Sequence, residues 1–331
     1  NRRSTLATLD PKKTTGWLNN PRLAIDGRLP ASSSGLTNTN RQKHRTCVNV
    51  PKADPKVLFG KEFRELFYAP DGWVFMGFDG AALEQRVAAW YTWQFDDGYY
   101  ASVILDGDSH TTNAEAYSKA AGMVITRSAG KNITYGVLYG ATAPKVAKML
   151  GISVERAKLI VDAFWDTNWS LKALRDALIA YWEETGKKYI SGIDGRKIYT
   201  RSKHSLLNCL FQSCGAIVMD LAGEILRKRL RDEGLHEDNE RVLYMHDEYQ
   251  YLVKKNEVKW KIFDTEEAAN DFDDGKTWSN VHSINESKHA RYYCRAGELA
   301  SWAVEEAGKR LGSPLPITAS YDVGQNWAGT H

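Results

Sequence analysis

A run without polar side chains, Trp73 to Phe78, constrains the fold of this chain more than any other segment. It lies between Gly72 and Asp79, and its length suits a strand rather than a helix. A strand that carries no polar side chain on either face has to be buried. We therefore expect a buried strand that ends at a carboxylate, Asp79.

A second β-rich stretch, "RVLYMHDEYQYLV", covers residues 241–253. It consists of two strand-like runs with a polar break at His246, Asp247 and Glu248, which predicts a hairpin with acids near its tip. If this hairpin and the first strand belong to one sheet, Asp79 and Asp247 converge on one point.

A largely helical block is expected between these two β-rich regions. Apolar residues recur there at helical spacing in six segments: residues 81–93, 109–122, 127–140, 143–150, 154–164 and 169–185. Asp108 or Ser109 is a suitable N-cap for the second of them. A hairpin with Asp194 and Gly195 in its turn follows, and then a long helix over residues 205–230.

The remaining segments carry weaker patterns. Residues 1–56 are rich in Pro, Gly, Ser and Asn, so loops and short strands are expected. Residues 254–290 show no period and indicate a surface insertion without assigned chemistry. Residues 290–311 predict a last helix, followed by an extended tail.

Composition indicates a folded, reduced protein. The 331 residues are 43% hydrophobic, which is enough to bury a core. Their net charge of +3 is too small to indicate a nucleic-acid partner. The four cysteines have neither disulfide-framework nor zinc spacing. The first residues lack a signal-peptide core, and no stretch approaches the roughly 18 uncharged residues of a membrane span. We expect a soluble cytoplasmic protein with no membrane partner.

The two separated acids suit phosphoryl transfer, although either one alone is more often a turn or cap residue. Magnesium is a hard cation that prefers carboxylate oxygens. Two such ions can activate an attacking hydroxyl and stabilise the leaving group. Asp79 and Asp247 are therefore candidate ligands for two Mg²⁺ ions.

A basic helix face provides a candidate anion site. Arg127, Lys131 and Tyr135 recur every four residues and so share one face of the expected helix over residues 127–140. Two cations at this spacing repel each other, and a bound triphosphate would relieve the repulsion. The alternative is a solvated basic face.

The order of these motifs resembles family A DNA polymerases. Arg-x3-Lys-x3-Tyr-Gly-x2-Tyr-Gly lies between "FDGAALEQR" and "HDE", which is similar to motifs A, B and C of that family, especially in the replicative polymerases of short-tailed phages. "GDSHTTNA", "GRKIYTRSKHSLLNCLFQSCGA" and the terminal "GQNWAGTH" resemble further family segments. The resemblance covers about residues 22–253 and 314–331.

The resemblance implies an α+β right-hand polymerase fold with an antiparallel palm sheet and a helical fingers subdomain. Residues 1–108 would form the N-terminal palm segment with motif A, and residues 109–185 the fingers with motif B. Residues 186–331 would form the C-terminal palm with motif C and an insertion near residues 254–290. The implied reaction is template-directed DNA synthesis, in which two metal ions assist nucleotidyl transfer from a dNTP to a primer 3′ hydroxyl.

The resemblance also implies the catalytic roles. Asp79 and Asp247 would bind both Mg²⁺ ions, with the carbonyl of Gly80 as a further ligand. Glu248 would be an accessory acid near the primer end. Lys131 would bind the α-phosphate region and donate a proton to pyrophosphate.

Other residues would bind the incoming dNTP. His110 and Arg127 would hold its outer phosphates, while Glu84 would close the pocket at the sugar as a steric gate against a 2′ hydroxyl. Tyr135 would lie at the base of the ribose pocket. A tyrosine there implies tolerance of dideoxynucleotides.

A third group would touch primer-template DNA. Tyr139 would stack near the templating base. The residues expected at the minor groove and primer terminus, where acceptors are similar for every base pair, are Arg41, Arg196, Asn208, Gln212 and His246. Arg41 departs from the family pattern, because the usual Thr-Gly-Arg is here Thr39-Asn40-Arg41.

Thumb helices and an exonuclease domain are not found ahead of the palm in this sequence. The resemblance then implies either a fragment or a split polymerase whose second polypeptide supplies the thumb and an exonuclease. The thumb supplies much of the backbone contact to DNA, so grip without it would be poor.

Two other functions compete with DNA synthesis. A single-subunit RNA polymerase or primase-like enzyme shares much of the motif pattern, but such enzymes carry a small residue at the gate and usually Ser after His-Asp, where this chain has Glu84 and Glu248. A catalytically inactive DNA-binding module is the other alternative. The retained acids and the basic helix face argue against it.

Overall fold

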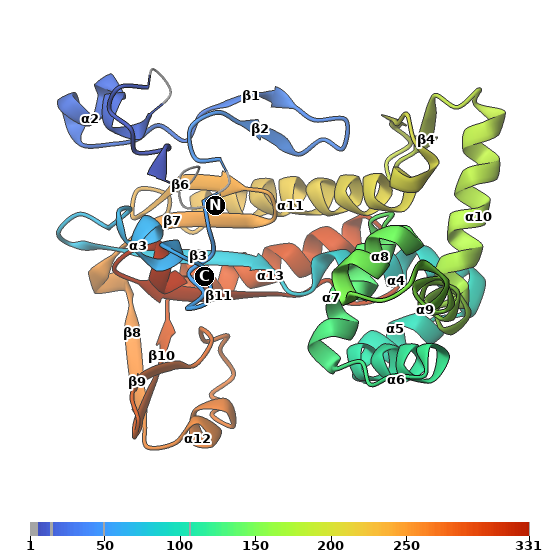
Figure 1. The fold of residues 1–331 in the computed structure, drawn as a ribbon. Helices are drawn as coiled ribbons and strands as arrows, with labels where there is room; N and C mark the ends of the chain where they lie inside the picture. Colours follow the sequence, from blue (N-terminus) through green and yellow to red (C-terminus); the bar gives the residue numbers. More distant parts are fainter. Residues whose placement is uncertain (1–5, 14–15, 49, 106, 331) are drawn as a thin grey trace.

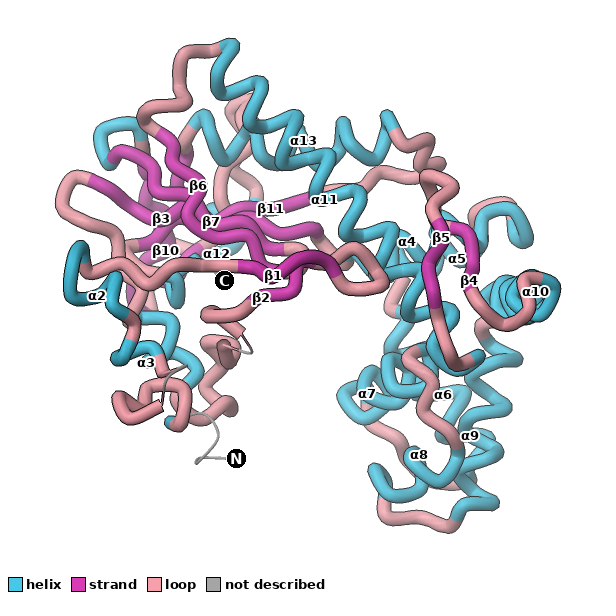
Figure 2. Tube along the Cα trace, turned by 90° about the horizontal axis from the view of Figure 1, so that it is seen from above, coloured by secondary structure: helices cyan, strands magenta, loops and turns pink. Residues whose placement is uncertain are grey.

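The computed structural model describes residues 6–13, 16–48, 50–105 and 107–330. Figure 1 shows a half built on β-sheet and a half built of helices, with the long helix α11 (Leu206–Asp232) running between them. Seen from above in Figure 2, the helical half projects beside the sheet half. One continuous hydrophobic core nevertheless contains residues of both halves.

The expected buried strand is confirmed at the centre of a four-stranded sheet. The strand order is β11-β3-β7-β6, and each neighbouring pair is antiparallel. The bounds are β3 Trp73–Gly80, β6 Asn239–Met245, β7 Glu248–Lys254 and β11 Ala319–Gly324. The expected hairpin is β6 and β7, and it joins the same sheet as β3.

The two faces of this sheet are covered by different parts of the chain, because successive side chains of a strand point to opposite faces. Tyr249 donates a hydrogen bond to the carbonyl of Met219 in α11, and Tyr321 packs against Gly297 in α13 (Arg295–Arg310). The opposite face carries Gly77 and Gln250 and is covered by the C-terminal turn η4 (Trp327–Thr330).

The helical half contains one helix more than the sequence predicts. Its helices are α4 Leu83–Asp96, α5 Tyr99–Leu105, α6 Ser109–Ala121, α7 Arg127–Leu138, α8 Ala143–Leu150, α9 Val154–Thr167 and α10 Trp169–Glu184. Helix α5 was missed because it is short, although Asp96 accepts from the backbone N–H groups of Gly98 and Tyr100 and so caps its start. Helix α4 packs against both α10 and α11.

The N-terminal region contains the short strands that were expected and also helices. Strands β1 (Ser33–Leu36) and β2 (Gln42–His44) form a hairpin. Helix α2 (Pro21–Asp26) makes the expectation of only loops and strands wrong, and its signals are local. The side chain of Asn20 caps it, proline occupies its first position, and Gly27 ends it at φ 69°. Helix α3 (Gly60–Glu65) and the short turn η1 (Trp17–Asn19) complete this region.

The second expected hairpin is present as β4 (Tyr189–Ser191) and β5 (Lys197–Tyr199). The short turn η2 (Lys203–Ser205) leads from it into α11. The β4–β5 hairpin therefore lies at the end of α11 that is nearest to the helical half (Figure 1).

The segment over residues 254–290, for which the sequence showed no clear period, has regular structure of its own. It begins with the turn η3 (Lys255–Glu257) and forms a three-stranded sheet, β8-β10-β9, with a short helix. The bounds are β8 Lys259–Phe263, α12 Glu266–Asn270, β9 His282–Asn285 and β10 Lys288–Tyr293. The last helix therefore starts at Arg295 and not at residue 290, and the predicted tail contributes β11 as an edge strand of the main sheet.

The expectation that no segment is apolar enough to cross a membrane was wrong by length and composition. Within the described chain, Lys203–Asp232 has the required length and contains an 18-residue window with a mean hydropathy of 1.4. However, 78% of its most apolar window is buried inside the protein, as in the core helix of a water-soluble domain. The four cysteines are buried and free.

Candidate active site

Strand pairing places the two predicted metal-binding acids at one end of the sheet. Asp79 of β3 lies directly opposite Glu248, the first residue of β7. Asp247 immediately precedes Glu248 in the turn from β6, where His246 adopts the left-handed conformation at φ 59°. The sheet thus brings together positions that are far apart in the sequence, as the hairpin pattern predicted.

Glu248 itself points into the protein and is only 5% exposed. Its Oε1 accepts hydrogen bonds from Trp327 Nε1 and, at 2.8 Å, from Gln250 Nε2. The guanidinium of Arg64 lies 3.7 Å from the same oxygen. The contacts of Glu248 therefore indicate a structural task behind the turn, and its role near the primer end stays a prediction.

Glu84, the predicted steric gate, lies in the first turn of α4 and has two partners. Arg41 Nη2 is 3.2 Å from Glu84 Oε1, and the hydroxyl of Tyr139 donates a hydrogen bond to Oε2. Burial raises the pKa of Glu84, Arg41 opposes the shift, and the charge of Asp247 adds to it. Glu84 is thus within electrostatic reach of the acidic turn.

The loop that carries Arg41 explains the departure from Thr-Gly-Arg. Asn40 has φ 63°, in the left-handed region that glycine adopts freely and asparagine tolerates better than most residues. Its Nδ2 donates to Ser213 Oγ at 3.0 Å, and Asn38 Nδ2 donates to the carbonyl of Tyr199 at 3.0 Å. These bonds fix the loop against α11 and the β4–β5 hairpin.

The predicted phosphate-binding cations lie where α6 and α7 begin. Asp108 caps α6 by accepting from the backbone of His110 and Thr111, as expected, and it also accepts from Arg127 Nε at 2.7 Å. Burial lowers the pKa of His110, and the charges of Lys131 and Arg127 lower it further. The charges of Arg127 and Lys131 therefore reach His110 and disfavour its protonated form, which leaves Arg127 and Lys131 as the cations of this group.

A row of aromatic rings connects these cations with Glu84. The ring centroids of His110 and Tyr135 are 5.8 Å apart, and those of Tyr135 and Tyr139 are 6.0 Å apart. Burial raises the pKa of Tyr135, and the charge of Glu84 adds to the shift. Tyr135 therefore lies between the phosphate-binding and gate residues, as its predicted place in the sugar pocket requires.

The predicted minor-groove residues on α11 share one half-buried face. Asn208 and Gln212 are four residues apart in the helix. The Oδ1 atom of Asn208 is buried and has no hydrogen-bond partner among the described residues. Arg196 is exposed in the β4–β5 hairpin, but its Nε donates to Asp194 at 2.6 Å.

The donor set fits magnesium that enters together with a substrate. The described residues contain no cluster of three or more His, Cys, Asp or Glu side chains suited to hold a metal. Magnesium is usually held by only one or two carboxylates, with substrate phosphates and water completing its shell. Asp79, Asp247 and the carbonyl of Gly80 match this type of site.

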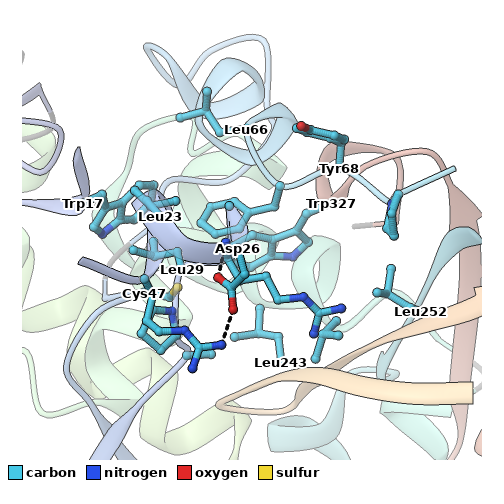
Figure 3. A pocket seen from close by; sticks show the side chains of 18 of the residues that line it. Trp17, Leu23, Asp26, Leu29, Cys47, Leu66, Tyr68, Leu243, Leu252 and Trp327 are labelled. Carbon is cyan, nitrogen blue, oxygen red and sulfur yellow. Dashed lines mark hydrogen bonds and ion pairs between the residues drawn. The ribbon is translucent and has the colours of Figure 1, made fainter. Parts of the chain in front are cut away.

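A pocket of about 670 Å³ lies away from all the predicted site residues, none of which lines it. Figure 3 shows Trp17, Leu23 and Leu29 of the N-terminal segment facing Leu243 and Trp327 across it. Sequence reasoning did not identify Arg64, Gln250 and Trp327 as functional candidates. Of these three, only Trp327 could have been found from the sequence, because it belongs to the terminal motif "GQNWAGTH". The final residue of that motif, His331, lies outside the described residues.

Comparison with known proteins gives a consistent result. A profile of DNA polymerase family A matches residues 19–268. The DNA-directed DNA polymerase of Escherichia phage T7 is 32% identical over 274 residues, which is 75% of this chain and 38% of that protein. The corresponding polymerase of Enterobacteria phage T3 is 31% identical over the same shares. This chain thus spans about 38% of the length of these relatives.

One solved structure shares the fold. It is the POL domain of Pol1 from M. smegmatis, in complex with DNA primer-template and dNTP. The TM-score is 0.69 at 20% sequence identity, over 95% of this chain and 50% of that one. This likeness supports the mixed helix and antiparallel-sheet architecture.

Proposed function

The chain belongs to DNA polymerase family A, and we propose that it catalyses template-directed DNA synthesis by nucleotidyl transfer from a dNTP to a primer 3′ hydroxyl. The observation that carries the proposal is the strand register that sets Asp79 beside the Asp247 turn. Arg127 and Lys131 of α7, with the imidazole of His110 at the start of α6, supply a second, independent element of such a site.

Asp79, Asp247 and the carbonyl of Gly80 would hold two Mg²⁺ ions. When bound, these ions lower the pKa of the attacking hydroxyl and neutralise charge on the leaving pyrophosphate. The carboxylates lie on rigid strands and at a tight turn, so the chain would hold the ions with little reorganisation.

The cations would bind and orient the triphosphate. Arg127 and His110 would contact the outer phosphates, and Lys131 would bind near the α-phosphate and donate a proton to the departing pyrophosphate. Before binding, Arg127 has to leave Asp108, to which it donates in this structure. Substrate phosphates would replace that carboxylate with oxygens of greater total charge.

Glu84 would screen the sugar of the nucleotide, with Tyr135 at the base of the same pocket. Arg41 and Tyr139 hold the Glu84 carboxylate at both oxygens, which suits a residue that excludes substrates by its position. Tyr139 would have to release Glu84 in order to stack near a templating base.

Primer-template DNA would be contacted through Asn208 and Gln212 on α11, with Arg41, Arg196 and His246 nearby. The Nδ2 group of Asn208 would supply the donor that minor-groove acceptors need, since the Oδ1 atom of the same amide is buried and has no hydrogen-bond partner among the residues described here. We further propose that a second polypeptide, or a further segment of a longer chain, supplies the thumb and an exonuclease. The limited share of the relatives' length that is covered motivates this part of the proposal.

Primer extension with the Asp79→Asn and Asp247→Asn variants tests the function. Each should reduce Mg²⁺-dependent dNTP incorporation by about a hundredfold to a thousandfold, as expected when a group that stabilises transition-state charge is lost, while primer-template binding persists. Asp71→Asn, at an exposed acid before β3, is the matched control and should retain activity. Unchanged incorporation in the Asp79 variant would refute the metal role.

The same assay tests the partner. The chain alone should extend primers in a distributive manner at physiological salt, because few backbone contacts hold the duplex. Processive synthesis by the purified chain would exclude a requirement for a separate thumb.

A further inference from the structure

We propose that Arg64 is a positioning residue for the turn that carries Asp247, and that it acts through Glu248 and Trp327. This inference rests on the proposed function, because it concerns the placement of the acids that would hold the metal ions. It begins from a buried cation that the predicted chemistry does not use.

Arg64 is buried, with only 3% of its surface exposed, and several contacts fix its position. It lies in α3, and its Nε donates to the carbonyl of Pro51 at 2.9 Å. Its guanidinium lies over the ring of Trp327, 4.4 Å from the ring centroid. Stacking and a backbone hydrogen bond thus fix the plane of the guanidinium, which faces Glu248.

Glu248 receives donors from separate parts of the chain at one oxygen, as described for the active site. One of these donors is Gln250 Nε2. The Gln250 side chain is itself held in place, because Thr330 Oγ1 donates a hydrogen bond to Gln250 Oε1 at 2.8 Å. Helix α3, strand β7 and the C-terminal turn are therefore joined at the residue that directly follows Asp247. Moving this anchor would move the backbone of the turn.

The cost of the arrangement argues for a role beyond stability. A buried ion pair loses hydration, and well-packed apolar side chains often give equal or greater stability in its place. Arg64 Nη1 lies 3.7 Å from Glu248 Oε1, which makes an ion pair and not a hydrogen bond. The direction of the Glu248 carboxylate is fixed by the hydrogen bonds from Trp327 and Gln250, and Arg64 adds the opposite charge and its stacking on Trp327. The strand opposite Glu248 carries Asp79, so the same anchor controls the spacing of both acids.

Four variants separate positioning from stability. Arg64→Met removes the charge but keeps an apolar chain, and Arg64→Lys keeps the charge but loses the planar fork. Arg64→Met combined with Glu248→Gln leaves no unpaired buried charge, so it should recover much of the melting temperature lost in Arg64→Met alone. Arg291→Met is the control, because Arg291 also donates to backbone carbonyls, but within the β8–β10 segment.

The first readout is Mn²⁺ binding to the free chain, measured by electron paramagnetic resonance. Arg64→Met and the double variant should weaken the Mn²⁺ site that depends on Asp79 and Asp247 by about fivefold or more, and Arg64→Lys should do so less. The second readout is single-turnover incorporation at saturating dNTP, which should fall about tenfold or more with little change in KM for dNTP, as misplacement of a catalytic group predicts. Arg291→Met should change neither.

The outcomes separate this inference from the proposed function. Variants that lose melting temperature but keep Mn²⁺ affinity and the rate per active site would show that Arg64 is only structural, and Mn²⁺ binding that does not need Asp79 would also overturn the inference. If Mn²⁺ binding depends on Asp79 and on Arg64 while no variant and no wild-type chain incorporates dNTP, the positioning role stands and the polymerase proposal fails.

Discussion

The hydroxyl of Tyr139, the residue that directly follows α7, donates a hydrogen bond to Oε2 of Glu84 in the first turn of α4. Arg41 holds the other carboxylate oxygen. The predicted gate residue is therefore bound by two of the residues predicted to contact DNA. Any movement of Tyr139 toward a templating base has to break a bond to the gate.

Replacement of Glu84 should relax sugar selection. We expect Glu84→Ala to raise the ratio of ribonucleotide to deoxyribonucleotide incorporation by about tenfold or more, because a pocket that loses a side chain no longer excludes one extra hydroxyl. Competitive single-nucleotide extension measures this ratio. Tyr139→Phe is the control, since it removes only the hydrogen bond and should change the ratio much less; equal effects of the two variants would contradict the gate role.

Neutralising Asp108 should strengthen triphosphate binding. In the Asp108→Asn variant the amide oxygen can still cap α6, but the uncharged side chain no longer competes with phosphate for Arg127. We expect KM for dNTP to fall about 1.5- to 5-fold, the range that exposed ion pairs support. Asp166→Asn breaks an exposed pair with Lys172 elsewhere in the helical half and should leave KM unchanged.

Acid should weaken the contact between the starts of α6 and α7. The hydrogen bond from Arg127 holds the pKa of Asp108 well below its usual value of 3.8, with a smaller contribution from Thr111. A carboxylate with a lowered folded-state pKa stabilises the fold fully above its unfolded value, and this stabilisation is lost as the pH falls through the folded value. The melting-temperature difference between wild type and Asp108→Ala should therefore be constant above about pH 5 and shrink below pH 3.8. A difference that grew on acidification would contradict this.

Adding a methyl group at Gly77 should disturb the sheet face behind the acids. A Cβ there would lie 2.3 Å from Gln250 Nε2 and 2.6 Å from the carbonyl oxygen of Thr330. We expect Gly77→Ala to lower the free energy of unfolding by about 1–3 kcal/mol, as overpacking does. Gly136→Ala is the matched control, because its nearest contact would be 3.7 Å and it lies inside α7. It should stabilise the protein by about 0.4–1 kcal/mol in denaturant titrations.

Local sequence patterns, which involve residues only a few positions apart, were enough to predict most helices and strands. The apolar run of β3, the helical periods and the β6–β7 hairpin all appear where the sequence indicated. The resemblance to family A polymerases also implied the side chains that the structure gathers around Glu84 and Arg127. These signals are local because strand alternation, helix faces and caps depend on neighbours one to four positions away.

Tertiary structure decided the contacts between distant segments. The hydrogen bond from Tyr139 to Glu84 spans 55 positions, and the one from Trp327 to Glu248 spans 79. The position of β11 at the sheet edge and the inward turn of Glu248 are of the same kind. Burial and strand pairing set these features only when the chain folds, so no local sequence period encodes them. The sequence alone identified the acids. The packing of α3 and the C-terminal turn determined which of them faces into the protein.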